Sequence, residues 1–424
     1  MGSRVKNIIP IVCDPEKAKE SSVKINSALR RELWICLLTK YEKFEFENTH
    51  NLPQGPGFVI KSGGSTGGPH YCLQPCQNLT QSALATAKWL LNQAIIPKDC
   101  QIINVLPLNH ISGLMAWWRS QQWGCKHTWL EPSSIRSPIC LQESSQLYLD
   151  PSDGPLITSL VPTQLHRLMQ EKEGILWLKK FSIIWLGGSI ITKSITQKAR
   201  DLGIQLAPSY GATETAAMIT ALTPREFLAG DNSLGKVLPD IALSLGNQNG
   251  LKVRTSRIAK ARWSHGKLEP LLNKDGWWES GDIAELITTN NQQMLKIIGR
   301  LDNAINSGGE TVFPEKLSMR LMEIACQKKI SIENLLFLGV KDKEWGERLV
   351  VVAKIKTTKE SEIPSKVFLT LKEEISNWPP YEKPIAWYNC QNLKPNDLGK
   401  WDMKKWKAWI TTHPKTLYKF LIQY

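Results

Sequence analysis

Short apolar runs alternate with helix-like segments between about residues 55 and 210, and this alternation limits the possible fold more than any other feature. The apolar runs are 58–60, 102–107, 156–162 and 181–188, and the segments with helical spacing are 81–96, 113–123, 163–170 and 191–203. Strands that alternate with helices favour a sheet with a large parallel component. Because such sheets bind ligands at the carboxyl ends of their strands, we expect an α/β fold with its site at that edge.

Further units are predicted beyond this region. The chain has 424 residues, about three times the length of a typical single domain. Candidate strands follow at 235–246, 250–263, 283–288 and 294–300, in a stretch rich in turns. A second, smaller α/β unit begins after Arg300, with helices at 314–328 and 365–378 and strands at 334–340 and 349–356.

The first 50 residues contain one amphipathic segment, 27–44, in which Leu29, Leu33 and Leu37 recur at helical spacing. We therefore expect a helix there. The pattern leaves open whether the first 50 residues join the sheet or form a separate cap.

The formal net charge of +14 favours acidic partners, since 53 Lys and Arg residues outnumber 39 Asp and Glu residues. No basic run, RNP-type motif or helix-turn-helix signal accompanies this charge. Small anions such as nucleotides, CoA and carboxylates are therefore better candidate partners than nucleic acid.

Nine cysteines are scattered along the chain without a C-x-x-C pair, which favours reduced structural thiols over a metal site. No apolar window approaches the roughly 18 residues of a membrane span, and the apolar patch near the start is too short for a signal peptide. We expect a cytoplasmic protein with no transmembrane segment.

Residues 61–70 read KSGGSTGGPH and directly follow an apolar run. Consecutive glycines let backbone N–H groups turn toward one point, and Ser62, Ser65 and Thr66 add hydroxyl donors, which suits a phosphate. The segment lacks the Gly-Lys-Ser/Thr ending of a Walker A loop, so a P-loop NTPase is disfavoured. A turn with no ligand is the simpler alternative.

Four further segments follow in order: SYGATETAAM (209–218), WWESGDIAEL (277–286), IIGRLDNAINSGGETVFPEKL (297–317) and LKPNDLGKWD (393–402). Together with the glycine-rich segment they resemble the motifs of the acyl-adenylate-forming superfamily, which includes acyl-CoA synthetases, peptide-synthetase adenylation domains and luciferases. The resemblance covers roughly residues 55–405. Within the superfamily, LPLNHISGLMAWWRS (106–120) is similar to the o-succinylbenzoate–CoA ligases.

The resemblance implies an α/β fold with a large N-terminal AMP-binding domain (1–301), which includes a small β-rich subdomain. A smaller, mobile α+β domain (302–424) follows. The implied activity is that of an AMP-forming acid–thiol ligase, which joins o-succinylbenzoate to the α-phosphate of ATP and then transfers the acyl group to CoA. ATP, Mg²⁺ and CoA are the implied cofactors and co-substrate, and menaquinone or phylloquinone synthesis is the implied pathway. Since superfamily members are often dimers, a homodimer is compatible with the resemblance.

The resemblance also implies an ATP site. The glycine-rich loop would hold the β- and γ-phosphates, Tyr210 would stack on adenine, and Asp282 with Arg300 would bind the ribose. The implied ATP-binding residues are Gly63, Gly64, Ser65, Thr66, Gly67, Tyr210, Gly211, Thr213, Asp282 and Arg300, with Glu214 as the metal ligand. The chain departs from the family at His70, where a lysine is usual; Lys61 either compensates or is a solvated strand-end residue.

The implied catalytic residues are Lys400, Glu214, Thr213 and His110. Lys400 would bridge the carboxylate and the α-phosphate during adenylation, although a solvated lysine is the simpler interpretation. Without the other motifs, Glu214 would be an ordinary acid at a helix N-terminus. His110 would close the carboxylate pocket, with a core or capping histidine as the alternative.

The remaining implied roles concern the acyl group, the hinge and CoA. Arg119 would meet the second carboxylate of the substrate, although a salt bridge on a helix surface is the alternative. The strand-end residues Gly187, Gly188 and Ser189 would border the acyl pocket. Asp302 would be the hinge between the domains, and Gly308 and Gly309 would line the CoA tunnel.

Three other functions compete with the o-succinylbenzoate ligase. The nearest is another aryl- or acyl-CoA ligase on the same scaffold. A catalytically silent nucleotide-binding protein would have little reason to keep Glu214, Asp282, Arg300 and Lys400 together. A nucleic-acid binder is supported by net charge alone.

Overall fold

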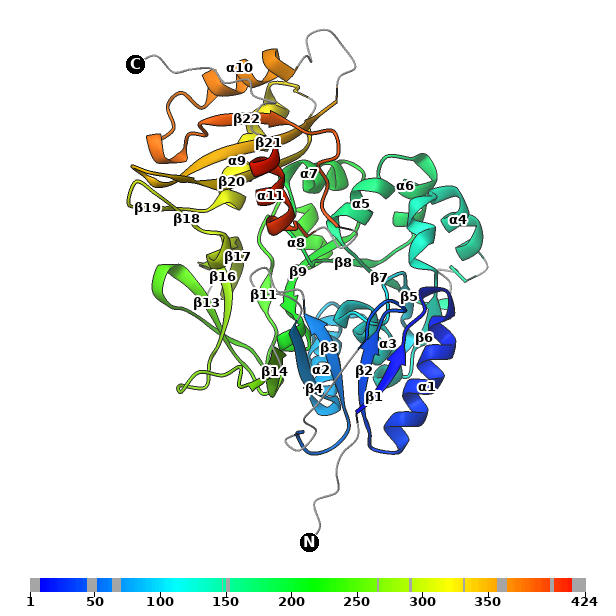
Figure 1. The fold of residues 1–424 in the computed structure, drawn as a ribbon. Helices are drawn as coiled ribbons and strands as arrows, with labels where there is room; N and C mark the ends of the chain where they lie inside the picture. The colour runs from blue at the N-terminus through cyan, green and yellow to red at the C-terminus, as the bar shows by residue number, and fades with distance from the viewer. Residues whose placement is uncertain are drawn as a thin grey trace.

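Three β-sheets organise the chain (Figure 1). The computed structural model describes residues 8–43, 52–62, 70–146, 148–149, 153–264, 267–289, 292–330, 332–356, 364–396 and 400–413. The expected phosphate-loop residues Gly63, Gly64, Ser65, Thr66 and Gly67 lie outside this part of the chain.

The first sheet has six strands, in the order β1 (Ile8–Val12), β2 (Trp34–Leu38), β3 (Gly57–Ser62), β4 (His70–Pro75), β14 (Ala261–Ser264) and β15 (Lys267–Glu269). The strands β1, β2 and β3 are parallel, and the later pairs are antiparallel. One face of the sheet packs on α1 (Ala18–Arg30), α2 (Cys76–Leu91) and α3 (Ile111–Trp123). Residues 8–38 therefore join this sheet and its helical layer instead of forming a separate cap.

The helix expected at 27–44 is wrong. Helix α1 ends at Arg30, Glu32 follows with a φ of 54°, and Trp34–Leu38 forms β2. All five residues of β2 are buried, because apolar clusters cover both faces of the sheet there. A short apolar run that is buried on both faces lacks the alternation of a half-exposed strand, so Leu37 of β2 lay at helical spacing from Leu29 and Leu33 by chance.

The second sheet has eleven strands, and one half of it is the parallel part expected from the sequence. The parallel strands are β6 (Lys126–Trp129), β5 (Gln101–Asn104), β7 (Leu156–Leu160), β8 (Ile183–Leu186) and β9 (Leu206–Ala212). Helices α2 and α3 cover one face, and α4 (Pro138–Gln146), α5 (Pro162–Leu168), α6 (Lys172–Leu178) and α7 (Lys193–Asp201) cover the other. Helices α2 and α3 thus form the layer between the first two sheets.

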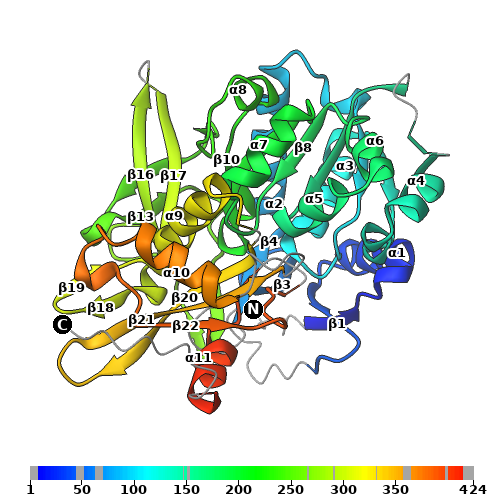
Figure 2. The ribbon, with the colours of Figure 1, turned by 90° about the horizontal axis from the view of Figure 1, so that it is seen from above.

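The other half of the second sheet is antiparallel. It contains β10 (Ala217–Ala221), β11 (Lys236–Val237), β12 (Ala242–Leu245), β13 (Gly250–Arg254), β16 (Trp278–Thr289) and β17 (Gln292–Arg300), with α8 (Pro224–Leu228) between β10 and β11. The stretch 250–263, expected as one strand, divides into β13 and β14, which lie in different sheets. Strands β16 and β17 form a long hairpin that projects from the sheet (Figure 2).

The third sheet is formed by the C-terminal part of the chain. Its strands are β18 (Ile305–Ser307), β19 (Glu310–Val312), β20 (Ile332–Asp342), β21 (Gly346–Ile355) and β22 (Ala386–Asn389). Helices α9 (Pro314–Gln327) and α10 (Pro364–Glu374) cover one face, and α11 (Met403–Thr412) covers the other. An ion pair of 2.9 Å between Lys193 Nζ on α7 and Glu323 Oε1 on α9 joins this unit to the larger part of the molecule.

Within the described residues, no helix combines the length and the apolar character needed to cross a bilayer. All nine cysteines of the chain fall in this part, and each is present as a free thiol.

Two neighbouring residues of α10 allow a test of the C-terminal core. Phe368 is 2% exposed and lies 5.4 Å from the Trp387 ring, whereas Leu369 is 40% exposed. We expect Phe368→Ala to lower the free energy of unfolding by about 3 to 5 kcal/mol, because it leaves a cavity. Leu369→Ala is the matched control and should change it by less than about 1 kcal/mol. Chemical denaturation measures both, and equal losses would contradict this packing.

Candidate active site

Glu214 lies in the short turn Thr213–Thr215 between β9 and β10, where the first two sheets meet. It is 8% exposed. The Ser62 hydroxyl at the end of β3 donates to Glu214 Oε1 at 2.7 Å, and His70 Nε2 at the start of β4 lies 3.5 Å from the same oxygen. Burial alone would raise the pKa of Glu214, but the hydrogen bonds from His70 and Ser62 outweigh it, and the pKa lies below its usual value. The carboxylate is therefore ionised at neutral pH.

The two basic residues beside the glycine-rich segment have different partners. His70 contacts Glu214, whereas the Lys61 ammonium forms an ion pair with Glu42 Oε1. The Lys61 ammonium is thus engaged by a carboxylate of the N-terminal segment, and its compensation for the absent loop lysine stays a prediction.

The backbone on the N-terminal side of Glu214 is closely held by neighbouring segments. Thr213 is 9% exposed, and its carbonyl accepts a hydrogen bond of 2.7 Å from Gln74 Nε2. Gly211 lies in β9, where an added Cβ would come within 2.1 Å of the Ala217 carbonyl oxygen. Only glycine therefore allows β9 and β10 to approach so closely.

A chain of polar contacts joins Tyr210, Asp282, Arg300 and Asp302. Asp282 and Arg300 are register partners on β16 and β17. Arg300 Nη1 donates to Asp282 Oδ1 at 3.0 Å, and Arg300 Nη2 donates to Asp302 Oδ2 at 2.8 Å. The Tyr210 hydroxyl donates to Asp282 Oδ2 at 2.5 Å. Burial raises the pKa of Asp282, although Arg300 and Tyr210 oppose this shift.

Lys400 lies between β22 and α11. Its backbone N–H donates to Asn396 Oδ1 at 2.9 Å, and its carbonyl accepts from the Asn396 N–H at 2.9 Å. Although the residue as a whole is exposed, partial burial of its ammonium lowers the pKa; Arg300 adds to this shift, and Glu214 and Asp282 oppose it. The ammonium therefore lies within electrostatic reach of these three side chains.

His110 immediately precedes α3 but makes no side-chain capping hydrogen bond, so the capping alternative is wrong. Burial lowers its pKa, and the charge of Lys400 lowers it further. The imidazole is therefore neutral at pH 7 and lies close enough to Lys400 to respond to its charge.

Arg119 lies on α3 and is 4% exposed. Its guanidinium carbon is 4.8 Å from the centre of the Trp185 ring, and in the described part of the chain its Nε and Nη2 groups have no hydrogen-bond partner. The surface salt bridge considered from the sequence is therefore wrong. Burial, with a contribution from Arg257, lowers the pKa of Arg119 to about 9, so the side chain is still a cation at neutral pH. A buried cation with unused donors favours an anionic ligand.

Gly187, Gly188 and Ser189 directly follow β8, the strand that carries Trp185. Because the Arg119 guanidinium lies over the Trp185 ring, Arg119 lies near the end of β8. Sequence reasoning missed Trp185, because a tryptophan in a buried apolar strand carries no sign of function.

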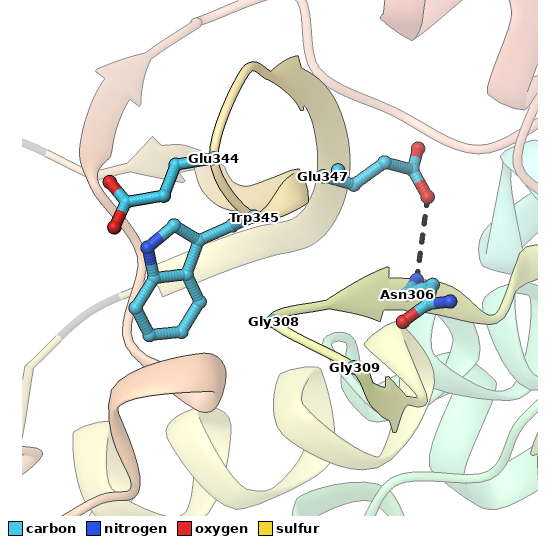
Figure 3. A pocket seen from close by; sticks show the side chains of 7 residues that line it. Asn306, Gly308, Gly309, Glu344, Trp345 and Glu347 are labelled. Carbon is cyan, nitrogen blue, oxygen red and sulfur yellow. Dashed lines mark hydrogen bonds between the residues drawn. The ribbon is translucent and has the colours of Figure 1, made fainter.

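Gly308 and Gly309 line a hollow of about 500 Å³ together with Asn306, Glu344, Trp345, Gly346 and Glu347 (Figure 3). The hollow lies between the β18–β19 and β20–β21 turns. A Cβ at Gly308 would come within 2.5 Å of the Trp345 ring, and Gly308 N–H donates to the Trp345 carbonyl at 3.0 Å. Sequence reasoning also missed Trp345, although Gly346 between two strand-like runs is a turn signal that could have indicated this loop.

The profile of the family described as "AMP-binding enzyme" matches residues 5–257. A 2-succinylbenzoate–CoA ligase of Salmonella typhimurium is 30% identical over 301 residues, which cover 71% of this chain and 58% of the relative. The Escherichia coli protein of the same name is 27% identical over 347 residues, which cover 82% of this chain and 67% of that protein. The alignment thus spans less than two thirds of the Salmonella ligase.

Solved structures show the same fold. The o-succinylbenzoate CoA synthetase (MenE) of Bacillus subtilis in complex with the acyl-adenylate OSB-AMP matches with a TM-score of 0.75 at 18% identity, covering 95% of this chain and 88% of that one. A variant of E. coli MenE with bound OSB-AMS matches with a TM-score of 0.66 at 23% identity, covering 96% and 88%. The adenylate-forming fold expected from the sequence is confirmed.

The family profile covers more than half of the chain, from the first strand through the Glu214 turn to Arg257. The chain belongs to the AMP-binding enzyme family.

Proposed function

We propose that this chain is an AMP-forming acid–thiol ligase that activates o-succinylbenzoate with ATP and transfers the acyl group to CoA. The observation that carries the proposal is the hydrogen-bonded Asp282–Arg300 pair, which Tyr210 on β9 links to the turn of Glu214. The influence of Glu214, Asp282 and Arg300 on the pKa of Lys400 supports placing Lys400 in the same region. The names of the Salmonella and E. coli relatives, and the succinylbenzoyl adenylate in the B. subtilis structure, support this choice of substrate. The product would enter menaquinone or phylloquinone synthesis.

The nucleotide would lie across the second sheet. Asp282 offers acceptor oxygens to the ribose hydroxyls beside Arg300, and Tyr210 supplies an aromatic face for adenine next to Gly211. The Tyr210–Asp282 hydrogen bond supports this assignment, since it fixes the ring relative to the carboxylate. Thr213 would reach the α-phosphate, and the loop Gly63, Gly64, Ser65, Thr66 and Gly67 would hold the β- and γ-phosphates.

Glu214 would hold Mg²⁺. Protein sites commonly bind this ion through one or two carboxylates together with substrate phosphates, and an ionised, largely buried carboxylate fits that chemistry. When bound, Mg²⁺ neutralises charge on the phosphate oxygens. Ser62 and His70 both contact Oε1 of Glu214, which restricts the orientation of the carboxylate.

Two half-reactions follow from this arrangement. A carboxylate oxygen of the acid attacks the α-phosphorus of ATP, and pyrophosphate leaves. The Lys400 ammonium would bridge the carboxylate and the α-phosphate oxygens as charge develops in this step. The CoA sulfur then attacks the acyl carbonyl carbon, and AMP leaves.

The acyl group would lie along α3. The helix rises about 14 Å between His110 and Arg119, so the activated carboxylate beside His110 and a second carboxylate at Arg119 suit an extended dicarboxylate. Gly187, Gly188 and Ser189 would border the aromatic ring. The unpartnered N–H groups of Arg119 support this assignment, because a monocarboxylate substrate would leave them without an acceptor.

The second half-reaction would need the C-terminal domain, residues 302–424, to move relative to residues 1–301, with Asp302 as the hinge. The Arg300–Asp302 hydrogen bond lies at this junction, which supports the assignment. Gly308 and Gly309 would then line the path of CoA, with the Trp345 hollow beside them. The nine free thiols fit a cytoplasmic location, and a homodimer stays an expectation from the resemblance.

A panel of carboxylates tests the function directly. Pyrophosphate release with ATP and Mg²⁺ should be specific to o-succinylbenzoate, because Arg119 requires a second carboxylate, and a CoA thioester should form when CoA is added. Release with benzoates or fatty acids would indicate another aryl- or acyl-CoA ligase. Nucleotide binding without release for any acid would indicate a catalytically silent protein.

Lys400→Ala should slow adenylation about a hundredfold, or about 3 kcal/mol, because a donor to the developing charge is lost. Thioester formation from a synthetic acyl-adenylate should be unaffected. Single-turnover assays of the two steps separate these results, and Lys404→Ala, which removes an exposed lysine on α11, is the matched control. Equal loss in both steps would contradict the role of Lys400.

Arg119→Met should raise the KM for o-succinylbenzoate about 10-fold to 100-fold, the cost of one charged hydrogen-bond partner. The affinity for ATP should be unchanged, since the nucleotide lies elsewhere. Arg320→Met is the control, because Arg320 also stacks on an indole ring, Trp378, at 4.0 Å, but in the C-terminal unit. A parallel loss of ATP and acid binding would assign Arg119 to the stability of the fold instead.

A further inference from the structure

The turn that carries Glu214 has a strained backbone. Ala216 and Ala217 follow Thr215 with φ angles of 52° and 75°, a region that residues with a Cβ seldom adopt. Two consecutive residues of this kind persist only where the surrounding structure holds them. The position of Glu214, two residues earlier, therefore depends on contacts from outside the turn.

Neighbouring segments donate hydrogen bonds to the carbonyl groups of Glu214 and Ala216. Gln74 Nε2 donates to the Glu214 carbonyl at 3.1 Å, and the Ala259 N–H donates to it at 2.7 Å. A further contact lies within the turn itself, where the Thr215 hydroxyl donates to the Ala217 carbonyl at 2.7 Å. The Ala216 carbonyl accepts a hydrogen bond of 2.6 Å from the Ser82 hydroxyl on α2. The Ser82 contact therefore acts on a strained residue.

Arg257 fixes the direction of that hydroxyl. Arg257 Nη1 lies 2.7 Å from Ser82 Oγ, and a guanidinium can only donate. Ser82 Oγ must therefore accept from Arg257 and direct its single hydrogen to the Ala216 carbonyl. Arg257 is fully buried, and Asp240 holds it through an ion pair of 2.9 Å at Nε and a hydrogen bond of 3.3 Å at Nη2.

We propose that Arg257 is a positioning residue, which acts through Ser82 to hold the strained turn and so sets where the Glu214 carboxylate meets Mg²⁺ and the nucleotide phosphates. This inference rests on the proposed function, because it takes Glu214 as the metal ligand. It adds two residues, Arg257 and Ser82, that are separated from each other by 175 positions in the sequence.

The structure separates this role from simple packing. Ser82→Ala removes one oxygen atom and leaves the α2 backbone and its apolar contacts in place. In Arg257→Met the side-chain length is kept, and the remaining Asp240 carboxylate is 30% exposed and can be hydrated. Neither change touches Glu214, Ser62 or His70 directly.

The test is the Mg²⁺ dependence of nucleotide binding. A non-hydrolysable ATP analogue is titrated into the full chain by calorimetry at a series of Mg²⁺ concentrations. The affinity for the analogue should rise with Mg²⁺, and the Mg²⁺ concentration that gives half of this rise is determined. We expect Ser82→Ala and Arg257→Met each to raise this concentration about 10-fold to 100-fold, as for other residues that orient a metal ligand. The double variant should lose no more than the larger single loss, since both act through one hydrogen bond.

Two controls accompany these variants. Ser256→Ala removes an exposed serine that contacts Gln81, and Arg254→Met removes an exposed arginine three positions from Arg257; both should bind like the unmodified chain. Arg257→Lys should recover part of the loss, because an ammonium can still donate to Ser82.

The outcomes distinguish this inference from the function on which it rests. If Glu214→Gln shifts the Mg²⁺ dependence while Ser82→Ala and Arg257→Met leave it unchanged, the positioning role is overturned and the proposed function stands. If the variants shift it but the unmodified chain activates no carboxylate, the proposed function fails and the positioning role is supported. If Glu214→Gln leaves it unchanged, both the metal assignment and the positioning role are overturned.

Discussion

A carboxylate stays charged inside a protein only where hydrogen-bond donors or cations surround it, and Glu214 obtains these from a neighbouring sheet. Its turn belongs to the second sheet, whereas Ser62 and His70 lie on strands of the first. The same charge therefore stabilises the junction of the two sheets and leaves an anionic oxygen for a metal ion. Because the α2–α3 layer lies between these sheets, its apolar packing fixes how they meet at Glu214.

Buried positive charge is the second constraint on the site. Arg257 is neutralised by Asp240, but Arg119 has no carboxylate partner among the described residues and is destabilised further by the charge of Arg257. Stacking on Trp185 offsets part of the desolvation cost of Arg119 but supplies no acceptor for its N–H groups. An anion at this place would accept hydrogen bonds from these N–H groups and would offset the repulsion from Arg257, which supports the proposal of a dicarboxylate substrate over a hydrocarbon acid.

The sequence predicted the features that depend on local pattern. Strands β5, β7 and β8 appeared as apolar runs between helical segments. The association of Asp282 with Arg300 was implied by the family resemblance, and the two residues are register partners at the open end of the β16–β17 hairpin. Strand β2 was mistaken for helix because its burial comes from two distant layers. The contact between Arg257 and Ser82 could not be predicted either, since nothing local to either residue indicates a partner 175 positions away.

Arg300 joins two parts of the proposed reaction that the sequence treats as separate motifs. One of its terminal nitrogens binds Asp282, the residue proposed for the ribose, and the other binds Asp302, the proposed hinge. A ribose bound at Asp282 would share the Asp282 carboxylate with Arg300 and thereby alter the position of the guanidinium that also binds Asp302. If Asp302 is the hinge, as proposed, its contact with this guanidinium would respond to the nucleotide and would couple occupancy of the proposed ATP site to the position of Lys400 on the C-terminal side.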